Sequence, residues 1–138
     1  MSAARILVVD DNPTNLKLVS DVLAFEGHEI LSAVDAEEAQ VVLAETLPDL
    51  ILMDIALPGM DGLTLTRLLK ADARTSHIRI VALTAFAMIG DKQKALDAGC
   101  DGYITKPIDT RTLPKEVAGI LALANGATQG ETDENSSR

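Results

Sequence analysis

Two of the most apolar runs in the chain end in aspartate. The run Arg5-Ile-Leu-Val-Val ends at Asp10, beside Asp11, and the run that begins at Asp49 ends at Asp54. Carboxylates held close together repel, because a pair about 4 Å apart costs roughly 1 kcal/mol in water and about 4 kcal/mol at an intermediate dielectric. A divalent cation would offset that repulsion, and an all-oxygen site suits Mg²⁺ better than zinc. The aspartates are therefore candidate Mg²⁺ ligands.

Two further polar residues follow apolar runs nearer the C-terminus. Thr84 ends the run 78–84, and Lys106 follows the short run 102–105. A carboxylate beside a metal and a lysine can attack phosphorus to form an aspartyl phosphate, whose oxygens need hydroxyl, ammonium or amide partners. Asp54 is the best placed nucleophile, because it ends the most central predicted strand. Any one of these residues alone would more often be a cap or a loop residue, so the hypothesis depends on their joint placement.

The elements that must position these residues alternate along the chain. Strands are predicted at 5–10, 29–33, 49–54, 78–84 and 102–105. Helices are predicted from Pro13 to a stop at Gly27, with Asn12 as N-cap, at 35–46, around residues 65–69, up to about 98–99, and at 110–124. Continuous apolar strands alternating with helices predict an α/β fold, a doubly wound five-stranded parallel sheet. Ligands bind beyond the carboxyl ends of such strands, where the candidate residues lie.

Composition narrows the class of protein. The 138 residues suit one domain, predicted at 1–124 and followed by a disordered acidic tail at 125–138. A net charge of −9 disfavours binding to nucleic acid or to an anionic membrane. The single cysteine, Cys100, cannot form an internal disulfide. Neither a signal peptide nor an apolar stretch of about 20 residues is visible, so we predict a cytoplasmic protein.

Four motifs together resemble the response-regulator receiver family over roughly residues 4–124. They are ILVVDDNPTN, DLILMDIALPGMDG, VALTA and GYITKPI. The resemblance implies a flavodoxin-like (βα)5 fold with sheet order 2-1-3-4-5. The stretches TAFAMIGD and AGCDGYITKPI are most similar to DivK-like single-domain regulators and to receivers of hybrid histidine kinases. Of a single-domain regulator and a receiver excised from a longer protein, we favour the first.

The resemblance also implies roles for the acidic residues. Asp54 would be the phosphoacceptor. Mg²⁺ would be held by Asp10, Asp11, Asp54 and the backbone carbonyl of Ala56. Larger or polar side chains are common at the position of Ala56, where they help to control access of the attacking water and hence the lifetime of the phosphate.

The remaining roles concern the switch and its partners. Thr84 and Lys106 would bind phosphoryl oxygens, Tyr103 would be the aromatic switch residue, and the Lys106–Pro107 peptide would be cis. The phosphoryl donor would be a phosphohistidine on a histidine kinase or a histidine phosphotransfer protein. Output would pass to a downstream protein through the face of the fourth helix, fifth strand and fifth helix. Without the family match, Tyr103 would be read as an aromatic ring packed at a strand edge.

Three other classes of protein fit this sequence less well than a receiver does. A phosphatase of the haloacid-dehalogenase kind needs a second aspartate two residues after its nucleophile, where this chain has Ala56. A flavodoxin needs a phosphate loop rich in Ser, Thr and Gly after the first strand, where this chain has Asp10-Asp11-Asn12. A pseudo-receiver, which acts without phosphorylation, would lack part of a set that is complete in this chain: Asp10, Asp11, Asp54, Thr84 and Lys106. We therefore expect phosphorylation and dephosphorylation of Asp54 itself, without turnover of an external substrate.

Overall fold

The computed structural model describes residues 4–85 and 89–126 of the protein. Its strands are β1 (Arg5–Val9), β2 (Glu29–Ala33), β3 (Leu50–Asp54), β4 (Arg79–Thr84) and β5 (Gly102–Thr105). Its helices are α1 (Pro13–Phe25), α2 (Ala36–Glu45), α3 (Gly62–Ala71), α4 (Ile89–Ala98) and α5 (Leu113–Gly126). The predicted α/β alternation is confirmed.

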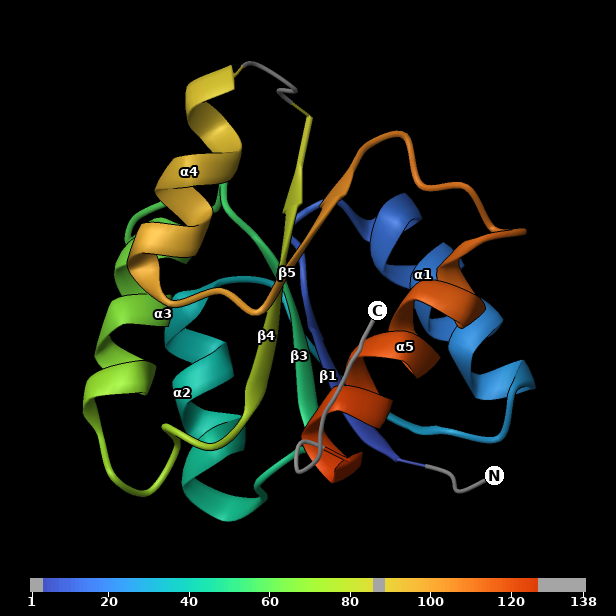
Figure 1. Ribbon diagram of the computed structural model, residues 1–138, viewed down its shortest axis with the longest axis horizontal. Helices are drawn as coiled ribbons and strands as arrows, with labels where there is room; N and C mark the ends of the chain where they lie inside the picture. The colour runs from blue at the N-terminus through green and yellow to red at the C-terminus, as the bar shows by residue number, and fades with distance from the viewer. Residues whose placement is uncertain (1–3, 86–88, 127–138) are drawn as a thin grey trace.

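The five strands form one parallel sheet in the order β2-β1-β3-β4-β5. Helices α1 and α5 cover one face, and α2, α3 and α4 cover the other (Figure 1). Each face carries its own buried apolar cluster, because successive side chains of a strand point to opposite sides. The expected doubly wound fold with order 2-1-3-4-5 is therefore confirmed.

Local sequence explains why the elements begin and end where they do. All five residues of β3 are buried, which is why this strand is a continuous apolar run without alternation. The Asn12 side chain accepts hydrogen bonds from two amides of the first turn of α1, at 2.9 and 3.1 Å, and Pro13 occupies the first turn. Gly27 follows that helix with φ +95°, a conformation that glycine adopts without strain.

The last helix differs from its predicted bounds of 110–124. It begins at Leu113 and continues to Gly126, because residues 110–112 form a turn in which the carbonyl of Asp109 accepts from the amides of Thr112 and Leu113. Pro114 lies in the first turn of α5 and marks this later start. The predicted tail therefore overlaps α5 at residues 125–126, and the rest of it lies outside the described residues.

An ion cluster joins α3 to the start of β4 and β5. The Asp101 carboxylate accepts from the amide of Ile80 at 2.9 Å, from Lys70 Nζ at 2.9 Å and from an Arg79 guanidinium nitrogen at 3.2 Å. Lys70 Nζ also donates to the carbonyl of Ile78 at 2.7 Å. The Asp101 side chain is only 21% exposed, so these donors lie in a partly desolvated region.

Removing this carboxylate should destabilise the fold. In Asp101→Ala, two cations and one amide lose a common acceptor, and we expect the free energy of unfolding to fall by about 2 to 4 kcal/mol. Urea unfolding monitored by circular dichroism measures the change. Asp97→Ala is the matched control, because this exposed carboxylate accepts from Gln93 of the same helix, and it should change stability by less than about 0.5 kcal/mol. Equal losses in the two variants would contradict the assignment.

Candidate functional site

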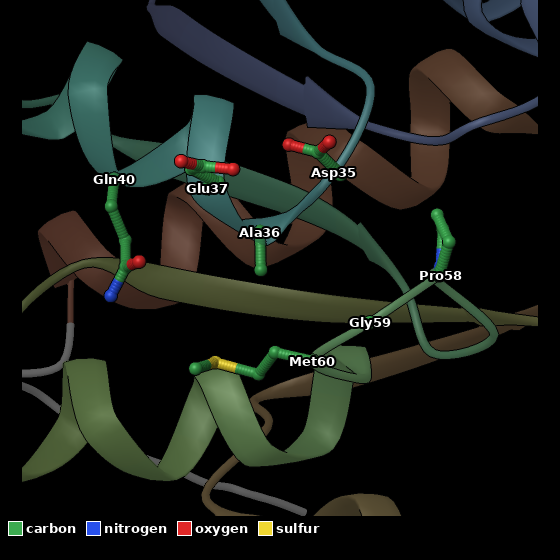
Figure 2. Close-up of a pocket in the computed structure, with 7 residues that line it drawn as sticks. All are labelled: Asp35, Ala36, Glu37, Gln40, Pro58, Gly59 and Met60. Carbon is green, nitrogen blue, oxygen red and sulfur yellow. The ribbon is translucent and has the colours of Figure 1, made fainter.

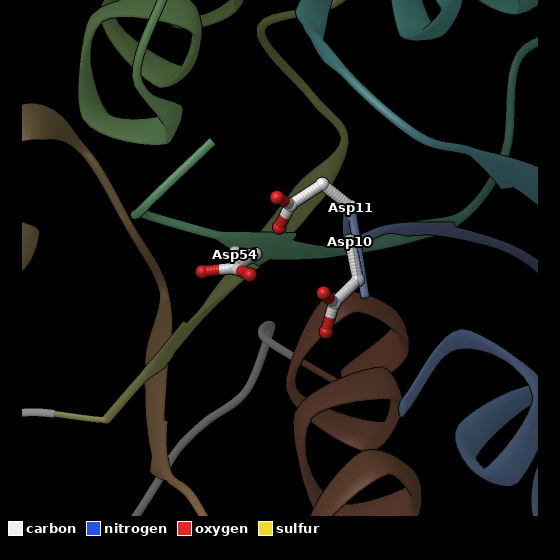
Figure 3. A group of neighbouring side chains, drawn as sticks. All are labelled: Asp10, Asp11 and Asp54. Atoms are coloured by element: carbon white, nitrogen blue, oxygen red, sulfur yellow. The ribbon is translucent and has the colours of Figure 1, made fainter. Parts of the chain in front are cut away.

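Three carboxylates converge at one edge of the sheet. One oxygen from each of Asp10, Asp11 and Asp54 lies within 4.8 Å of the others (Figure 3). The pairing of Val9 with Met53 brings the ends of β1 and β3 side by side, so the residues that follow are neighbours. Asp10 and Asp54 are 1% and 3% exposed, whereas Asp11 is exposed. The predicted convergence of the three aspartates is confirmed.

Backbone amides orient the two buried carboxylates. Asp10 Oδ1 accepts from the amide of Asn12 and Asp54 Oδ1 from the amide of Ala56, both at 2.9 Å. Each carboxylate thus closes a turn with the chain two residues on, and its second oxygen is left for the site. These two amide contacts were not predicted, although an aspartate at the junction of strand and loop is a known signal for such a turn.

Lys106 bridges the two buried carboxylates. Its Nζ lies 2.9 Å from Asp54 Oδ2 and 3.3 Å from Asp10 Oδ2. The loop after β5 places it there, since the amide of Lys106 donates to the carbonyl of Thr84 at 2.7 Å and the Lys106–Pro107 peptide bond is cis. Burial alone would lower the pKa of Lys106, but its contacts with Asp54 and Asp10 outweigh burial and raise it. The ammonium therefore stays charged at neutral pH.

One ammonium does not balance three carboxylates. Burial, followed by repulsion from Asp54, raises the pKa of Asp10 despite the opposing effects of the Asn12 amide and Lys106. Asp10 Oδ2 is buried and accepts no hydrogen bond from the described chain, because Lys106 approaches it at ion-pair distance without hydrogen-bond geometry. An unsatisfied buried oxygen among all-oxygen donors is the environment that a divalent cation such as Mg²⁺ fits.

The other predicted site residues lie on neighbouring elements. Thr84 is fully buried one residue beyond Leu83, the partner of Asp54 in the sheet. Tyr103, on the edge strand β5, is partly buried and packs against the cluster under α2, α3 and α4. Ala56 is exposed on the loop after β3.

The two histidines lie away from this edge. The Nδ1 atom of His28 accepts from the amide of Ala4 at 3.0 Å, before β1 begins, and His77 precedes β4. Both positions are at the amino ends of the strands. A histidine of this chain is therefore not available beside the aspartates.

A cavity of about 330 Å³ opens between the start of α2 and the loop before α3 (Figure 2). Its lining residues are Asp35, Ala36, Glu37, Gln40, Pro58, Gly59 and Met60. The three clustered aspartates are not among them. The cavity is therefore a feature of the surface next to the loop that follows Asp54, and it is separate from the carboxylate cluster.

This fold and this edge of the sheet match one protein family. The Response regulator receiver domain matches residues 6–118, and the chain belongs to this family. It is 44% identical over 116 residues to the polar-differentiation response regulator DivK of Brucella anthropi, covering 84% of this chain and 94% of DivK. It is 45% identical over 107 residues to the response regulator PleD of Caulobacter vibrioides, covering 78% of this chain but only 24% of PleD.

Solved structures agree with this assignment. A putative response regulator from Chloroflexus aurantiacus is 34% identical with a TM-score of 0.83, covering 88% of this chain and 99% of that structure. The receiver domain of a signal transduction histidine kinase from Syntrophus aciditrophicus is 33% identical with a TM-score of 0.80, covering 87% and 91%. The chain is thus a receiver domain of two-component response regulators, a family that acts as phosphoaccepting switches and interacts with histidine kinases or phosphotransfer proteins and with downstream targets. Within the described residues, none of the helices has the length and apolar character to cross a bilayer.

Proposed function

We propose that Asp54 accepts a phosphoryl group from a phosphohistidine of a histidine kinase or a histidine phosphotransfer protein. One observation carries this proposal: the buried Asp54 carboxylate lies beside two other carboxylates and 2.9 Å from the Lys106 ammonium. The arrangement places a candidate nucleophile next to a positive charge that can neutralise incoming phosphoryl oxygens.

The residues of the site divide the chemistry between them. Asp10, Asp11, Asp54 and the backbone carbonyl of Ala56 would hold Mg²⁺, which when bound supplies positive charge to the transferred phosphoryl group. An Asp54 oxygen attacks phosphorus, the phosphorus–nitrogen bond to the donor imidazole breaks, and its electron pair stays on that nitrogen. The Lys106 ammonium, which contacts Asp54 before transfer, then pairs with the phosphoryl oxygens.

The proposed output is a change of surface. The new dianionic group would draw in the hydroxyl of Thr84, and the Tyr103 ring would move into the space that Thr84 leaves. Because Tyr103 lies on β5, this movement alters the face formed by α4, β5 and α5, where we place the downstream protein partner. The local gain of charge thereby biases an element with two states.

Three further features bear on the reaction, on the partners and on the compartment. Ala56 stands where an aspartyl-phosphate phosphatase of the haloacid-dehalogenase kind has its acid, so the chain carries self-phosphorylation and self-dephosphorylation only. The net charge of −9 favours protein partners over nucleic acid and anionic membranes. The free, buried Cys100 suits a reducing compartment, and we place the cycle in the cytoplasm.

Acetyl phosphate tests the proposal without a partner protein. The wild-type protein is incubated with acetyl phosphate and Mg²⁺ and its intact mass is measured. We expect a gain of one phosphoryl group, which is absent when EDTA is present from the start, because Mg²⁺ is needed for the transfer. Peptide mapping should place the label at Asp54. A protein that gains no mass with Mg²⁺, or that is labelled at another residue, would refute the proposal.

A further inference from the structure

The first residue of α3 approaches the backbone of the phosphoacceptor strand unusually closely. A Cβ atom built on Gly62 would lie 2.3 Å from the backbone oxygen of Asp54 and 2.8 Å from the Cα of Ile55. The amide of Gly62 also donates to the carbonyl of Ile55 at 3.3 Å. Both obstacles are backbone atoms, which cannot rotate away as the end of a long side chain can. A side chain at position 62 therefore requires that α3 or the end of β3 moves by most of an ångström.

Two other glycines, Gly59 and Gly119, have no such close contact. Gly59, in the same loop, has φ +73° and open space around its Cβ position, so it is needed for its backbone conformation. Gly119, within α5, has no described atom within 4 Å of its Cβ position. Gly62 has no positive φ, so its lack of a side chain serves close approach.

Position 62 also departs from what helix formation favours. Glycine is a poor helix former, about 1 kcal/mol less favourable than alanine within a helix, and Asp61 already caps α3 by accepting from the amide of Thr64 at 2.8 Å. A poor helix former directly after a good cap agrees with a need for close approach at this position, a contact that was not predicted from the sequence.

We propose that Gly62 is a positioning residue for the phosphoacceptor site. It lets the first turn of α3 rest against the peptide that joins Asp54 to Ile55. The amide of Ala56 holds Asp54 Oδ1 at 2.9 Å, so a displaced peptide carries the carboxylate with it. The same displacement moves the Ala56 carbonyl, which is expected to bind Mg²⁺. The inference rests on the proposed function of Asp54.

Gly62→Ala, with Gly119→Ala as the matched control, tests the inference. A misplacement of about 1 Å can cost about 100-fold in rate. We therefore expect Gly62→Ala to accept a phosphoryl group from acetyl phosphate about 100-fold more slowly and to bind Mg²⁺ about tenfold more weakly. NMR of the metal-free protein should show the amides of Asp54, Ile55 and Ala56 shifted, which a loss of stability alone would not produce. Gly119→Ala should leave all three measurements unchanged.

Two outcomes would overturn the inference. A folded Gly62→Ala protein with wild-type Mg²⁺ affinity, rate and amide shifts would show that the close approach does not position the site. If Gly62→Ala unfolds, it is combined with Gly119→Ala, which should stabilise α5, and measured in sucrose. A protein that still does not fold would assign Gly62 to the fold as a whole.

The same experiment distinguishes a failure of the proposed function of Asp54 from a failure of the inference about Gly62. If the wild type and Gly119→Ala take up no phosphoryl group, the role of Asp54 is refuted. Mg²⁺ affinity and the amide shifts of Gly62→Ala then still decide whether Gly62 positions the carboxylates.

Discussion

An Asp54→Asn protein is expected to gain no phosphoryl group from acetyl phosphate and Mg²⁺, whereas the wild type gains one. An amide has no carboxylate oxygen with which to form the acyl phosphate, and it also removes one of the three charges that would hold the cation. A missing nucleophile leaves essentially no reaction, so we expect a loss of more than about 10⁴-fold. Intact mass spectrometry over a time course measures uptake.

Asp61→Asn is the matched control for this experiment. Asp61 is an exposed aspartate on the loop that follows Asp54, and its side chain caps α3. Asparagine caps a helix about as well, so both the fold and the phosphoryl uptake should be preserved. Uptake by Asp54→Asn at the wild-type rate would assign the reaction to another residue, and loss in Asp61→Asn would point to the loop as a whole.

Asp10→Asn is expected to have opposite effects on stability and on metal binding. The raised pKa of Asp10 means that the folded state favours its neutral form, chiefly because the group is buried and lies near Asp54. At neutral pH its charge therefore costs stability. Removing the charge without Mg²⁺ should raise the free energy of unfolding by on the order of 1 kcal/mol, while Lys106 keeps its partner Asp54 at 2.9 Å.

The dependence on pH follows from the direction of this shift. A group whose pKa is higher in the folded protein contributes stability that is fully present below its pKa in the unfolded chain, near 3.8 for an aspartate. That contribution is lost as the pH rises through the folded pKa. The advantage of Asp10→Asn should therefore be largest at neutral pH and should shrink as the pH falls towards and below 4. Urea unfolding without metal at several pH values measures it.

Saturating Mg²⁺ should reverse the order of stability. A ligand at 100 times its Kd stabilises the folded state by about 2.7 kcal/mol, and a variant that lacks one ligand gains less at the same concentration. Asp21→Asn, on the exposed side of α1, is the control, because its pair with Lys17 is worth only about 0.3 to 0.5 kcal/mol and it should respond to Mg²⁺ as the wild type does. An Asp10→Asn protein that is less stable than the wild type without metal would contradict the electrostatic argument.

The amino-acid sequence determined the alternation of elements and hence the fold class. A strand that is apolar along its whole length, such as β3, must be covered on both faces of the sheet. The helices that alternate with the strands supply the two covering layers. The resemblance to receivers added the strand order. Caps such as Asn12 were also predictable, because a cap is read from residues within one turn.

The exact ends of helices and the exposure of their side chains depend on more distant contacts and were harder to predict from the sequence. The start of α5 was predicted three residues early, at Thr110, because residues 110–112 form a turn in which the Thr112 amide donates to the Asp109 carbonyl three residues back, before the helix begins. Leu68, one of the leucines that marked the third helix, is 47% exposed, while its neighbours Leu65 and Leu69 are buried. A leucine at helical spacing indicates the helix, but neighbouring elements decide how much of it is covered.

At the site, the convergence of Asp10, Asp11 and Asp54 followed from the sequence alone. Parallel strands deliver their carboxyl ends to one edge, so residues at successive strand ends must become neighbours. Only the tertiary structure decided that one ammonium, from Lys106, lies between two of these carboxylates, and that the backbone at Gly62 closes on Asp54. Such distances depend on how loops and helices pack around the sheet.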